Sequence, residues 1–367
     1  MHIEKIELHN FRNYSNLELE FSKNVNLILG KNAQGKTNLL EAVYLTAIGR
    51  SFRTSKDIDL IKFNENNSIV KVWAEKELNS TTVEISIKRK GEKSSEKFIK
   101  KDKKNVTRTS QLLKNILIVI FSPEDLKIVK DEPEKRRKFI DRELSQISPK
   151  YYNSLSNYKK SLLQRNTYLK EENFEPSIID IWDVQLSKYG AEVIFLREKF
   201  IEKLSEYSSK IHSGITGGKE KLDILYEPNV EIKQSLSEQE DFIYSELKNS
   251  FKTDSRNRNT SVGPHRDDIL FVVNDIDMRN FGSQGQQRTC ALSLKLAELN
   301  LIKEKTDEDA ILLLDDVMSE LDADRQEFLI DTMKNNQLFI TTTELDQNIK
   351  DKFKELKIFY IENGNLI

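Results

Sequence analysis

The segment GKNAQGKT, residues 30–37, constrains the fold of this chain more than any other part of the sequence. It satisfies the pattern G-x4-G-K-[ST], in which glycines let the backbone wrap around phosphate groups with its N–H groups pointing inward. Alternating apolar residues, typical of β-strands, end at VNLIL just before it. TNLLEAVYLTAIG, just after it, has the apolar spacing of a helix that ends at Gly49. A strand, a glycine loop and a helix in this order predict a phosphate-binding loop within an α/β domain.

The loop residues have distinct expected roles in binding ATP. The Lys36 ammonium would reach the β- and γ-phosphates and act in catalysis, and the Thr37 hydroxyl would be a Mg²⁺ ligand. The other nucleotide-binding residues would contact the phosphates through their backbone; they are Gly30, Lys31, Asn32, Ala33, Gln34 and Gly35. The expected cofactors are therefore ATP and Mg²⁺.

A second element, ILLLDDVMSELD at residues 311–322, is an aliphatic strand that ends in two carboxylates. Asp315 would hold Mg²⁺, usually through water, and Asp316 would orient or deprotonate the attacking water. Acidic turns after buried strands are common, so this element alone would give weak support for catalysis. Together with the phosphate-binding loop, it predicts ATP hydrolysis by Lys36, Asp315 and Asp316.

A third element, FGSQGQQRTCALSLKLAEL at residues 281–299, is a loop rich in Gly and Gln that opens a helix. A serine and a glycine at a helix N-terminus form an anion site, because the first N–H groups have no partner within the helix and the dipole is positive there. Ser283, Gly285 and Gln286 are therefore predicted nucleotide-binding residues. The alternative is an ordinary capped helix, for which Ser283 is equally suited.

The pattern along the chain predicts an α/β domain interrupted by a helical insert. Strand signals occur in residues 1–29, 67–100 and 115–121, and they return near residues 222, 268, 310, 337 and 358. Apolar residues from Trp182 to Ile211 recur at helical spacing, which predicts one arm of a helical hairpin. We expect residues 1–130 and 255–367 to form one discontinuous α/β domain with a mixed sheet, and residues 131–254 to form a mostly helical arm or lid.

With 58 Lys and Arg against 60 Asp and Glu, the chain has a formal net charge of −2 and lacks a global basic field that would attract nucleic acid. Contact with DNA would need a local basic patch. Two candidates are the stretch 88–108 and the cluster KRRK at 135–138; their predicted DNA-contacting residues are Lys101, Lys103, Lys104, Lys135, Arg136 and Arg137. The alternative for the stretch 88–108 is a solvated hairpin and loop, because most charge runs are simply hydrated.

Other features of the sequence indicate a cytoplasmic protein with no membrane partner. The N-terminus carries charges every few residues and lacks the apolar region of a signal peptide. The longest aliphatic runs, ILIVI and AILLL, are far shorter than a membrane span. The single cysteine, Cys290, cannot form an internal disulfide and lies in an apolar helical pattern, so we expect a buried thiol.

The order of these elements resembles that of ABC-type ATPase heads, in which the serine-glycine signature of one protomer closes on the nucleotide held by the other. On this resemblance, residues 283–287 (SQGQQ) match the signature and residues 319–322 (SELD) match the D-loop. Residues 341–343 (TTT) occupy the place of the switch histidine. The resemblance implies a symmetric homodimer that forms on ATP and completes both nucleotide sites at once.

More specifically, the chain resembles the RecF family of bacterial recombinational repair nearly end to end. The matching segments are IEKIELHNFRNY, GKNAQGKTNLLEA, FSPEDL, PEKRRKFID, SVGPHRDDI, FGSQGQQRT and LLLDDVMSELD. The resemblance implies an ATP-dependent DNA-binding protein that acts with RecO and RecR partners in repair and replication restart. It would help the recombinase onto single-strand gaps, bind gapped or duplex DNA and single-strand junctions, and hydrolyse ATP weakly in a DNA-dependent way.

Two departures from the wider ABC pattern suggest slow hydrolysis. Asp315-Asp316 stands where an aspartate and a glutamate are usual, and SPED at residues 122–125 stands where the Q-loop glutamine is usual. Two other functions stay open, an SMC-like head that bridges DNA and an ABC-type ATPase without a DNA partner. Against the first, an insert of roughly 120 residues has no room for a long coiled coil. Against the second, the sequence has no membrane-facing apolar segment and reads SQGQQ rather than LSGGQ.

Overall fold

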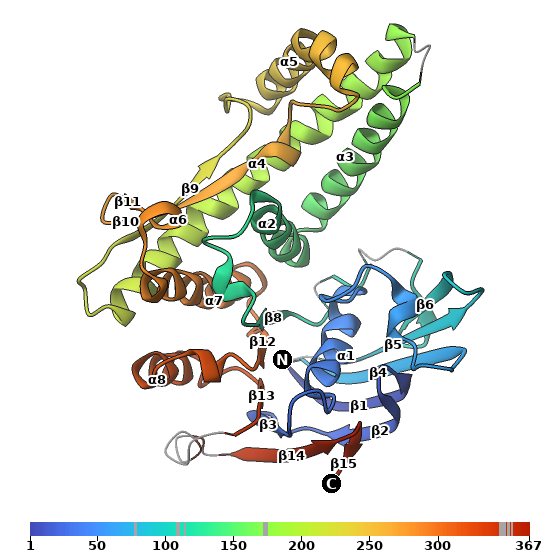
Figure 1. Ribbon diagram of the computed structural model, residues 1–367, viewed down its shortest axis with the longest axis vertical. Coiled ribbons are helices and arrows are strands. Elements are labelled where there is room, and N and C mark those ends of the chain that lie inside the picture. The colour runs from blue at the N-terminus through green and yellow to red at the C-terminus, as the bar shows by residue number, and fades with distance from the viewer. Residues whose placement is uncertain are drawn as a thin grey trace. The chain divides into compact units, whose positions relative to one another are not determined.

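The computed structural model describes residues 1–76, 79–107, 111–113, 115–171, 175–344, 350, 353 and 355–367. Within these residues the chain forms two compact units, drawn in Figure 1. Unit 1 contains Met1–Asp125 and Glu298–Ile367, and unit 2 contains Leu126–Ala297. The predicted insert, 131–254, lies wholly inside unit 2, which extends well beyond its second boundary.

A mixed sheet with the strand order β15-β14-β3-β13-β12-β8 forms one layer of unit 1. Its strands are β3 (Val25–Leu29), β8 (Ile118–Phe121), β12 (Ile311–Asp315), β13 (Leu338–Thr342), β14 (Leu356–Glu362) and β15 (Asn365–Leu366). Neighbouring strands are parallel, except for the antiparallel pair β14 and β15. Every residue of β3, β8, β12 and β13 is buried, as expected for parallel strands that are covered on both faces.

An antiparallel sheet with the strand order β2-β1-β4-β5-β6-β7 forms a second layer of unit 1. Its strands are β1 (His2–Phe11), β2 (Tyr14–Glu20), β4 (Asn67–Glu75), β5 (Ser80–Arg89), β6 (Ser95–Lys101) and β7 (Lys104–Asn105). Burial alternates along β4, so one face of this sheet points into the core. Helix α1 (Lys36–Ile48) shares one hydrophobic core with both sheets, and therefore every residue from Leu39 to Ile48 is buried.

The remaining elements of unit 1 are short. They are η1 (Asp57–Leu60), η5 (Met318–Glu320) and α8 (Ala323–Thr332), while η3 (Asp125–Lys127) lies at the first boundary between the units and α7 (Gln284–Thr306) crosses the second.

Unit 2 combines long helices with a small antiparallel sheet of order β11-β10-β9. Its elements are α2 (Pro133–Ile147), α3 (Pro149–Tyr168), α4 (Pro176–Ile215), β9 (Leu222–Glu227), α5 (Leu236–Asn257), η4 (Pro264–Arg266), β10 (Asp268–Val273), β11 (Ile276–Asp277) and α6 (Met278–Phe281). Because β10 pairs along its whole length with β9, the segment that follows α5 belongs to this unit.

Helices α3 and α4 lie side by side as the predicted hairpin (Figure 1). Gly190, within α4, marks a close approach between them. A Cβ atom at this position would lie 3.3 Å from the ring of Tyr158 in α3 and 3.5 Å from Pro264. A glycine inside a helix costs about 1 kcal/mol relative to alanine, and here the cost is offset by tighter packing of the two helices.

Two further expectations concern burial. Cys290, in α7, is fully buried as predicted, and burial raises the pKa of its thiol to about 12. Across the described part of the chain, we find no helix that combines the length and the apolar character needed to span a membrane.

Arg197 of α4 lies at the centre of a buried charge network in unit 2, with 2% of its side chain exposed. Its guanidinium donates to Asp141 of α2 and to Asp267, each at 2.8 Å, and to the carbonyl oxygen of Pro264 at 2.6 Å. Burial acts to raise the pKa of Asp141, but the charges of Arg197 and Lys159 outweigh it and lower the pKa. The network joins α2 and α4 to the turn SVGPHRDD.

We predict that Arg197→Ala lowers the free energy of unfolding by about 3–5 kcal/mol, because it leaves two carboxylates buried without their cation. Chemical denaturation followed by circular dichroism measures the loss. The lowered pKa of Asp141 stabilises the fold above the ordinary value of 3.8, and this contribution disappears as the pH falls through the folded pKa. The difference between Arg197→Ala and the parent protein should therefore narrow in acid.

The matched control is Lys159→Ala, which removes a half-exposed cation 2.8 Å from the same carboxylate. We expect it to cost at most about 1 kcal/mol, since solvent screens that pair. Equal losses from the two variants would contradict a special role for the buried guanidinium.

Candidate nucleotide-binding site

Two glycines let the phosphate-binding loop pass close to its neighbours between β3 and α1. A Cβ atom on Gly30 would lie 2.3 Å from the carbonyl oxygen of Ile361. Gly35 has a φ of 119°, and a Cβ atom there would lie 2.6 Å from the amide of Asn13. A side chain at either position would displace backbone or a neighbouring amide, so the loop shape requires glycine at both.

Residues outside the motif hold the loop from behind. Asn13 Nδ2 donates to the carbonyl oxygen of Gln34 at 2.8 Å, and the Tyr14 hydroxyl donates to that of Gly35 at 2.9 Å. The Gln34 side chain accepts from the backbone N–H of Asn363 at 2.7 Å. Sequence reasoning missed these supports; the only signal for them was the segment HNFRNY, which carried the family resemblance without an assigned role.

The N-terminus of α1 fits an anion. Its N-cap, Gly35, provides no side-chain hydrogen bond, and the first turn contains no acidic residue. The first N–H groups of an uncapped helix point out of its end, where the helix dipole is positive. The residues present therefore suit the phosphates of a nucleotide.

Lys36 projects its ammonium back across the loop. The side chain is buried and its Nζ donates to the carbonyl oxygens of Gly30 at 2.5 Å and Lys31 at 3.0 Å. Burial lowers the pKa of Lys36, while Asp316 and Asp315 act in the opposite direction. This cation, held inside the loop, is placed as the motif predicts.

The two predicted Mg²⁺ ligands are in direct contact. Thr37 Oγ1 donates to Asp315 Oδ1 at 2.8 Å, and Thr341 Oγ1 donates to the same oxygen at 2.8 Å. Asp315 is buried at the end of β12. Hydroxyl and carboxylate oxygens are the ligands that Mg²⁺ accepts, so the donor set fits this ion.

Asp316 follows in a left-handed backbone conformation, with a φ of 55°. Its N–H group lies 3.1 Å from both the carbonyl oxygen and the hydroxyl of Thr341, which fixes the turn. Burial raises the pKa of Asp316, opposed by Lys36 and supported by Asp315. A carboxylate with a raised pKa is a better proton acceptor near neutral pH. Thr341, in the place of the switch histidine, thus positions both aspartates.

The segments that resemble the D-loop and the Q-loop form local turns. The Ser319 hydroxyl donates to the carbonyl oxygen of Asp316 at 2.8 Å, which links the D-loop to the acidic pair. In the SPED segment, the Asp125 carboxylate accepts from the N–H and the hydroxyl of Ser122 at 2.8 and 2.7 Å. This carboxylate is therefore engaged in its own turn.

The signature segment belongs to unit 2, where Ser283 is exposed at the start of α7. Its hydroxyl accepts from the N–H of Gln286 at 3.2 Å, and the Gln286 side chain accepts from the N–H of Ser283 at 3.1 Å. This reciprocal pair is a capping box, so the helix is capped as the alternative reading expected. Gly285 lies in the first helical turn, and the nucleotide-binding role of the segment stays a prediction.

The basic residues after β5 form a hairpin tip. Lys101 pairs with Lys104 across a turn in which Asp102 and Lys103 have φ values of 49° and 66°. Positive φ at both central residues is the geometry of a type I′ turn. Lys103 and Lys104 are exposed and Lys101 is half-buried. Arg108, the predicted end of this basic stretch, lies outside the described residues.

The prediction that Arg136 contacts DNA is wrong. Its side chain is 0% exposed, and its guanidinium donates to the Asp268 carboxylate at 2.6 and 2.9 Å. Arg137 is half-buried and donates to the carbonyl oxygen of Asp267 at 2.7 Å, whereas Lys135 is exposed beside Asp131. The KRRK cluster lies on a helix, so part of it faces the core of unit 2 and part faces solvent.

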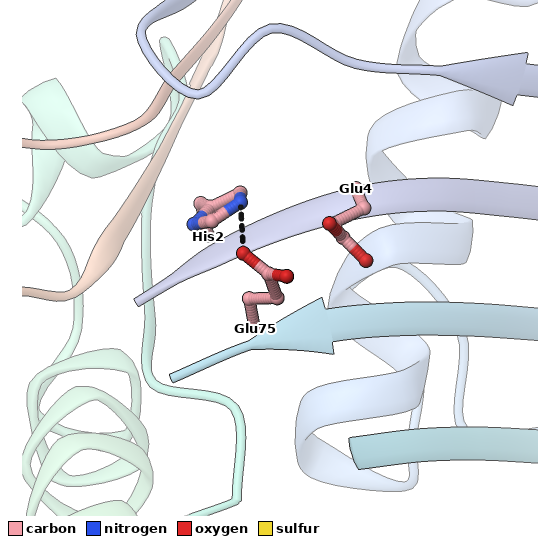
Figure 2. A group of neighbouring side chains, drawn as sticks. All are labelled: His2, Glu4 and Glu75. Carbon is pink, nitrogen blue, oxygen red and sulfur yellow. Dashed lines mark ion pairs between the residues drawn. The ribbon is translucent and has the colours of Figure 1, made fainter. Parts of the chain in front are cut away.

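A second group of metal-ligand types is shown in Figure 2. His2, Glu4 and Glu75 place their ligand atoms within 4.8 Å of one another. His2 Nε2 lies 3.3 Å from the Glu75 carboxylate, and the Lys23 ammonium lies 3.5 Å from it. These cationic groups offset the carboxylate charge of the cluster, and we assign no metal to it.

Comparison with known families gives one consistent match. Residues 2–366 match the family described as RecF/RecN/SMC N terminal domain. The DNA replication and repair protein RecF of Clostridium tetani (strain Massachusetts / E88) is 44% identical over 370 residues, which cover 100% of each chain. The protein of the same description from Clostridioides difficile (strain 630) is 41% identical over 371 residues, which cover 100% of this chain and 98% of the relative.

Solved structures agree with this match. The recombination mediator protein RecF-ATPrS in the RecFOR pathway superposes with a TM-score of 0.91 at 38% identity, covering 100% of this chain and 97% of the other. Its RecF-ATP counterpart gives 0.89 at 38% identity, covering 100% and 96%. An SMC head bound to the C-winged helix domain of ScpA gives 0.57 at 17% identity, covering 100% and 98%, which is a likeness of fold alone.

We predict that Thr341→Val raises the Mg²⁺ concentration needed for half-maximal ATP hydrolysis and slows turnover about tenfold, because Asp315 loses a fixed donor. A Mg²⁺ titration of phosphate release measures both effects. Thr341→Ser keeps the hydroxyl and should be nearly unchanged. Thr342→Val, whose hydroxyl donates to the carbonyl oxygen of Glu344 at 2.7 Å, is the neighbouring control. A similar change in Mg²⁺ dependence from both valine variants would contradict the assignment.

Proposed function

This chain belongs to the RecF family within the RecF/RecN/SMC proteins, and from that premise we propose that it is an ATP-controlled DNA-binding protein of recombinational repair and replication restart. The observation that carries the proposal is the contact of Thr37 with Asp315 beside the uncapped N-terminus of α1. This contact supports a site that binds the phosphates of ATP and its Mg²⁺ ion together.

The residues of the site have the chemistry for slow hydrolysis. When bound, Mg²⁺-ATP supplies a γ-phosphoryl group that can pass to water. Lys36 binds and orients the phosphates, and Thr37 and Asp315 hold the metal. Asp316 orients the attacking water and accepts its proton. Its side chain is shorter than the glutamate usual in ABC-type ATPases, so we propose that hydrolysis is weak and depends on DNA.

We propose an ATP-dependent homodimer in which Ser283, Gly285 and Gln286 of one protomer bind the nucleotide held by the other. Ser283 is exposed, and because its oxygen accepts the N–H of Gln286, its hydroxyl hydrogen can point toward an anion. Each chain has one phosphate-binding loop and one signature, so a symmetric pair completes both sites. ATP then acts as an interfacial ligand that stabilises the dimer until hydrolysis removes it.

We propose that the dimer binds gapped or duplex DNA at single-strand junctions through the lysines of the β6–β7 hairpin, with Lys135 and Arg137 as weaker candidates. Phosphate contacts of this kind position the protein without reading sequence. The solved relatives are described as components of a RecFOR pathway, which supports RecO and RecR as partners in helping the recombinase load. Residues 131–254 would act as the arm or lid, and the protein would work in the cytoplasm.

We predict that Lys36→Ala weakens ATP-driven dimerisation at least about tenfold, because it removes a charge-assisted contact to phosphate. Asp316→Asn should instead trap the dimer, since it keeps nucleotide binding and removes the proton acceptor. Light scattering with and without Mg²⁺-ATP measures both. The controls are each variant without nucleotide, which should scatter as the parent protein does. A Lys36→Ala dimer that forms normally with ATP would sink this proposal.

We predict that replacing Lys101, Lys103 and Lys104 together by glutamate weakens binding to a short gapped duplex and flattens its salt dependence by up to about 0.9 per lost phosphate contact. Fluorescence anisotropy with Mg²⁺-ATP at several salt concentrations measures this. The triple replacement by arginine keeps the charge and should preserve affinity. Unchanged affinity in the glutamate variant would return the hairpin to a solvated surface. Absence of ATP-dependent binding by the parent protein would favour an ATPase without a DNA partner.

A further inference from the structure

Two side chains outside the motifs, Glu220 and His212, connect the N-terminus of α7 to the last turn of α4 within unit 2. The Gln286 amide donates from Nε2 to Glu220 Oε1 at 2.9 Å. The other carboxylate oxygen of Glu220 lies 3.1 Å from His212 Nε2. His212 belongs to α4, and Glu220 follows in the loop before β9. The segment that carries the signature is therefore held by a residue from a different element.

The Gln286 side chain is fixed at both ends. Its Oε1 accepts from the N–H of Ser283 at 3.1 Å, while its Nε2 donates to Glu220. A carboxylate can only accept hydrogen bonds, so Glu220 dictates which end of the carboxamide faces the serine. With the opposite orientation, an amide nitrogen would meet the N–H of Ser283, and the capping box would be lost. Glu220 thus determines whether Gln286 can cap Ser283.

His212 fixes Glu220 in turn. Its imidazole is fully buried, and its Nδ1 lies 3.2 Å from the Ser293 hydroxyl, which also donates to the carbonyl oxygen of Thr289 at 2.8 Å. Gln286, Thr289 and Ser293 are spaced at helical intervals and share one face of α7. His212 and Glu220 therefore bridge two turns of α7 on the face that leads to the signature.

The loop between α4 and β9 has the geometry to present Glu220 in this way. Gly217 and Gly218 have φ values of 60° and 77°, a left-handed conformation that favours glycine. The N–H of Gly218 donates to the carbonyl oxygen of Ser213 at 2.8 Å, which closes the end of α4. The chain turns back within a few residues, so Glu220 faces the α4 residue His212.

We propose that Glu220, held by His212, is a positioning residue for the signature serine. It fixes the Gln286 carboxamide, which keeps Ser283 in the capped conformation whose hydroxyl hydrogen points toward the γ-phosphate of the nucleotide held by the partner protomer. The inference rests on the proposed ATP-dependent dimer, and it adds to that function a link between α4 and the composite nucleotide site.

The first experiment compares Glu220→Ala with the parent protein in three measurements. We expect nucleotide binding by the monomer and the Tm to stay close to the parent values, because Glu220 does not contact the phosphate-binding loop of its own unit 1. We expect ATP-driven dimerisation, followed by light scattering, to weaken about tenfold. Glu220→Gln retains an oxygen that can accept from Gln286 and should recover part of the affinity.

The matched control is Asp223→Ala on neighbouring β9. That carboxylate pairs with exposed Lys221 at 2.8 Å, and the variant should dimerise as the parent protein does. If the parent protein itself fails to dimerise with ATP, the proposed function fails. If the parent dimerises and Glu220→Ala dimerises equally well, only the present inference is overturned.

A mixing experiment tests the action across the dimer. Lys36→Ala has an inactive loop with an intact signature, and Glu220→Ala has an intact loop with a misplaced signature. A mixed dimer therefore contains one intact composite site, and random pairing of equal amounts should restore about a quarter of the parent ATP hydrolysis. Restoration above the sum of the separate variants supports the proposal. No restoration, with both proteins folded, overturns it in favour of a purely structural role for Glu220.

Discussion

The carboxylate of Asp315 is the contact on which the site in unit 1 depends. One of its oxygens accepts hydroxyl groups from Thr37, at the start of α1, and from Thr341, at the end of β13. These residues are far apart in sequence, and they meet because β3, β13 and β12 are parallel neighbours whose carboxyl ends lie at one edge of the sheet. The position of Lys36 over the loop and the turn at Asp316 are built around the same edge.

Unit 2 depends on buried charge instead. Arg136, Arg165 and Arg197 are all fully buried or nearly so, and each is paired with carboxylates from other elements. Burying such groups is expensive unless every partner is present, so these pairs favour one arrangement of the helices over others. The same constraint holds the turn SVGPHRDD, whose two aspartates pair with Arg197 and Arg136. Its acidic residues serve the fold of this unit.

Much of the architecture could be predicted from local patterns. The buried strands, the phosphate-binding loop followed by α1, and the helical hairpin all appear where periodicity and glycine spacing indicate them. The pairing of Thr37 with Asp315 also follows from two motifs that each imply Mg²⁺. The second boundary of unit 2 was not predictable, because the pairing of β10 with β9 joins segments that carry no shared pattern.

The sequence by itself determined the conformation of the phosphate-binding loop and the chemical type of its ligands, since both depend on residues a few positions apart. Only the tertiary structure decided that Asn13 supports the loop, that Arg136 is buried while Lys135 is exposed, and that Glu220 faces Gln286. Charged and polar side chains look alike in a sequence whether they meet solvent or a partner. Which of the two they meet is set by packing between distant segments, because a buried polar group is stable only where that packing supplies its partner.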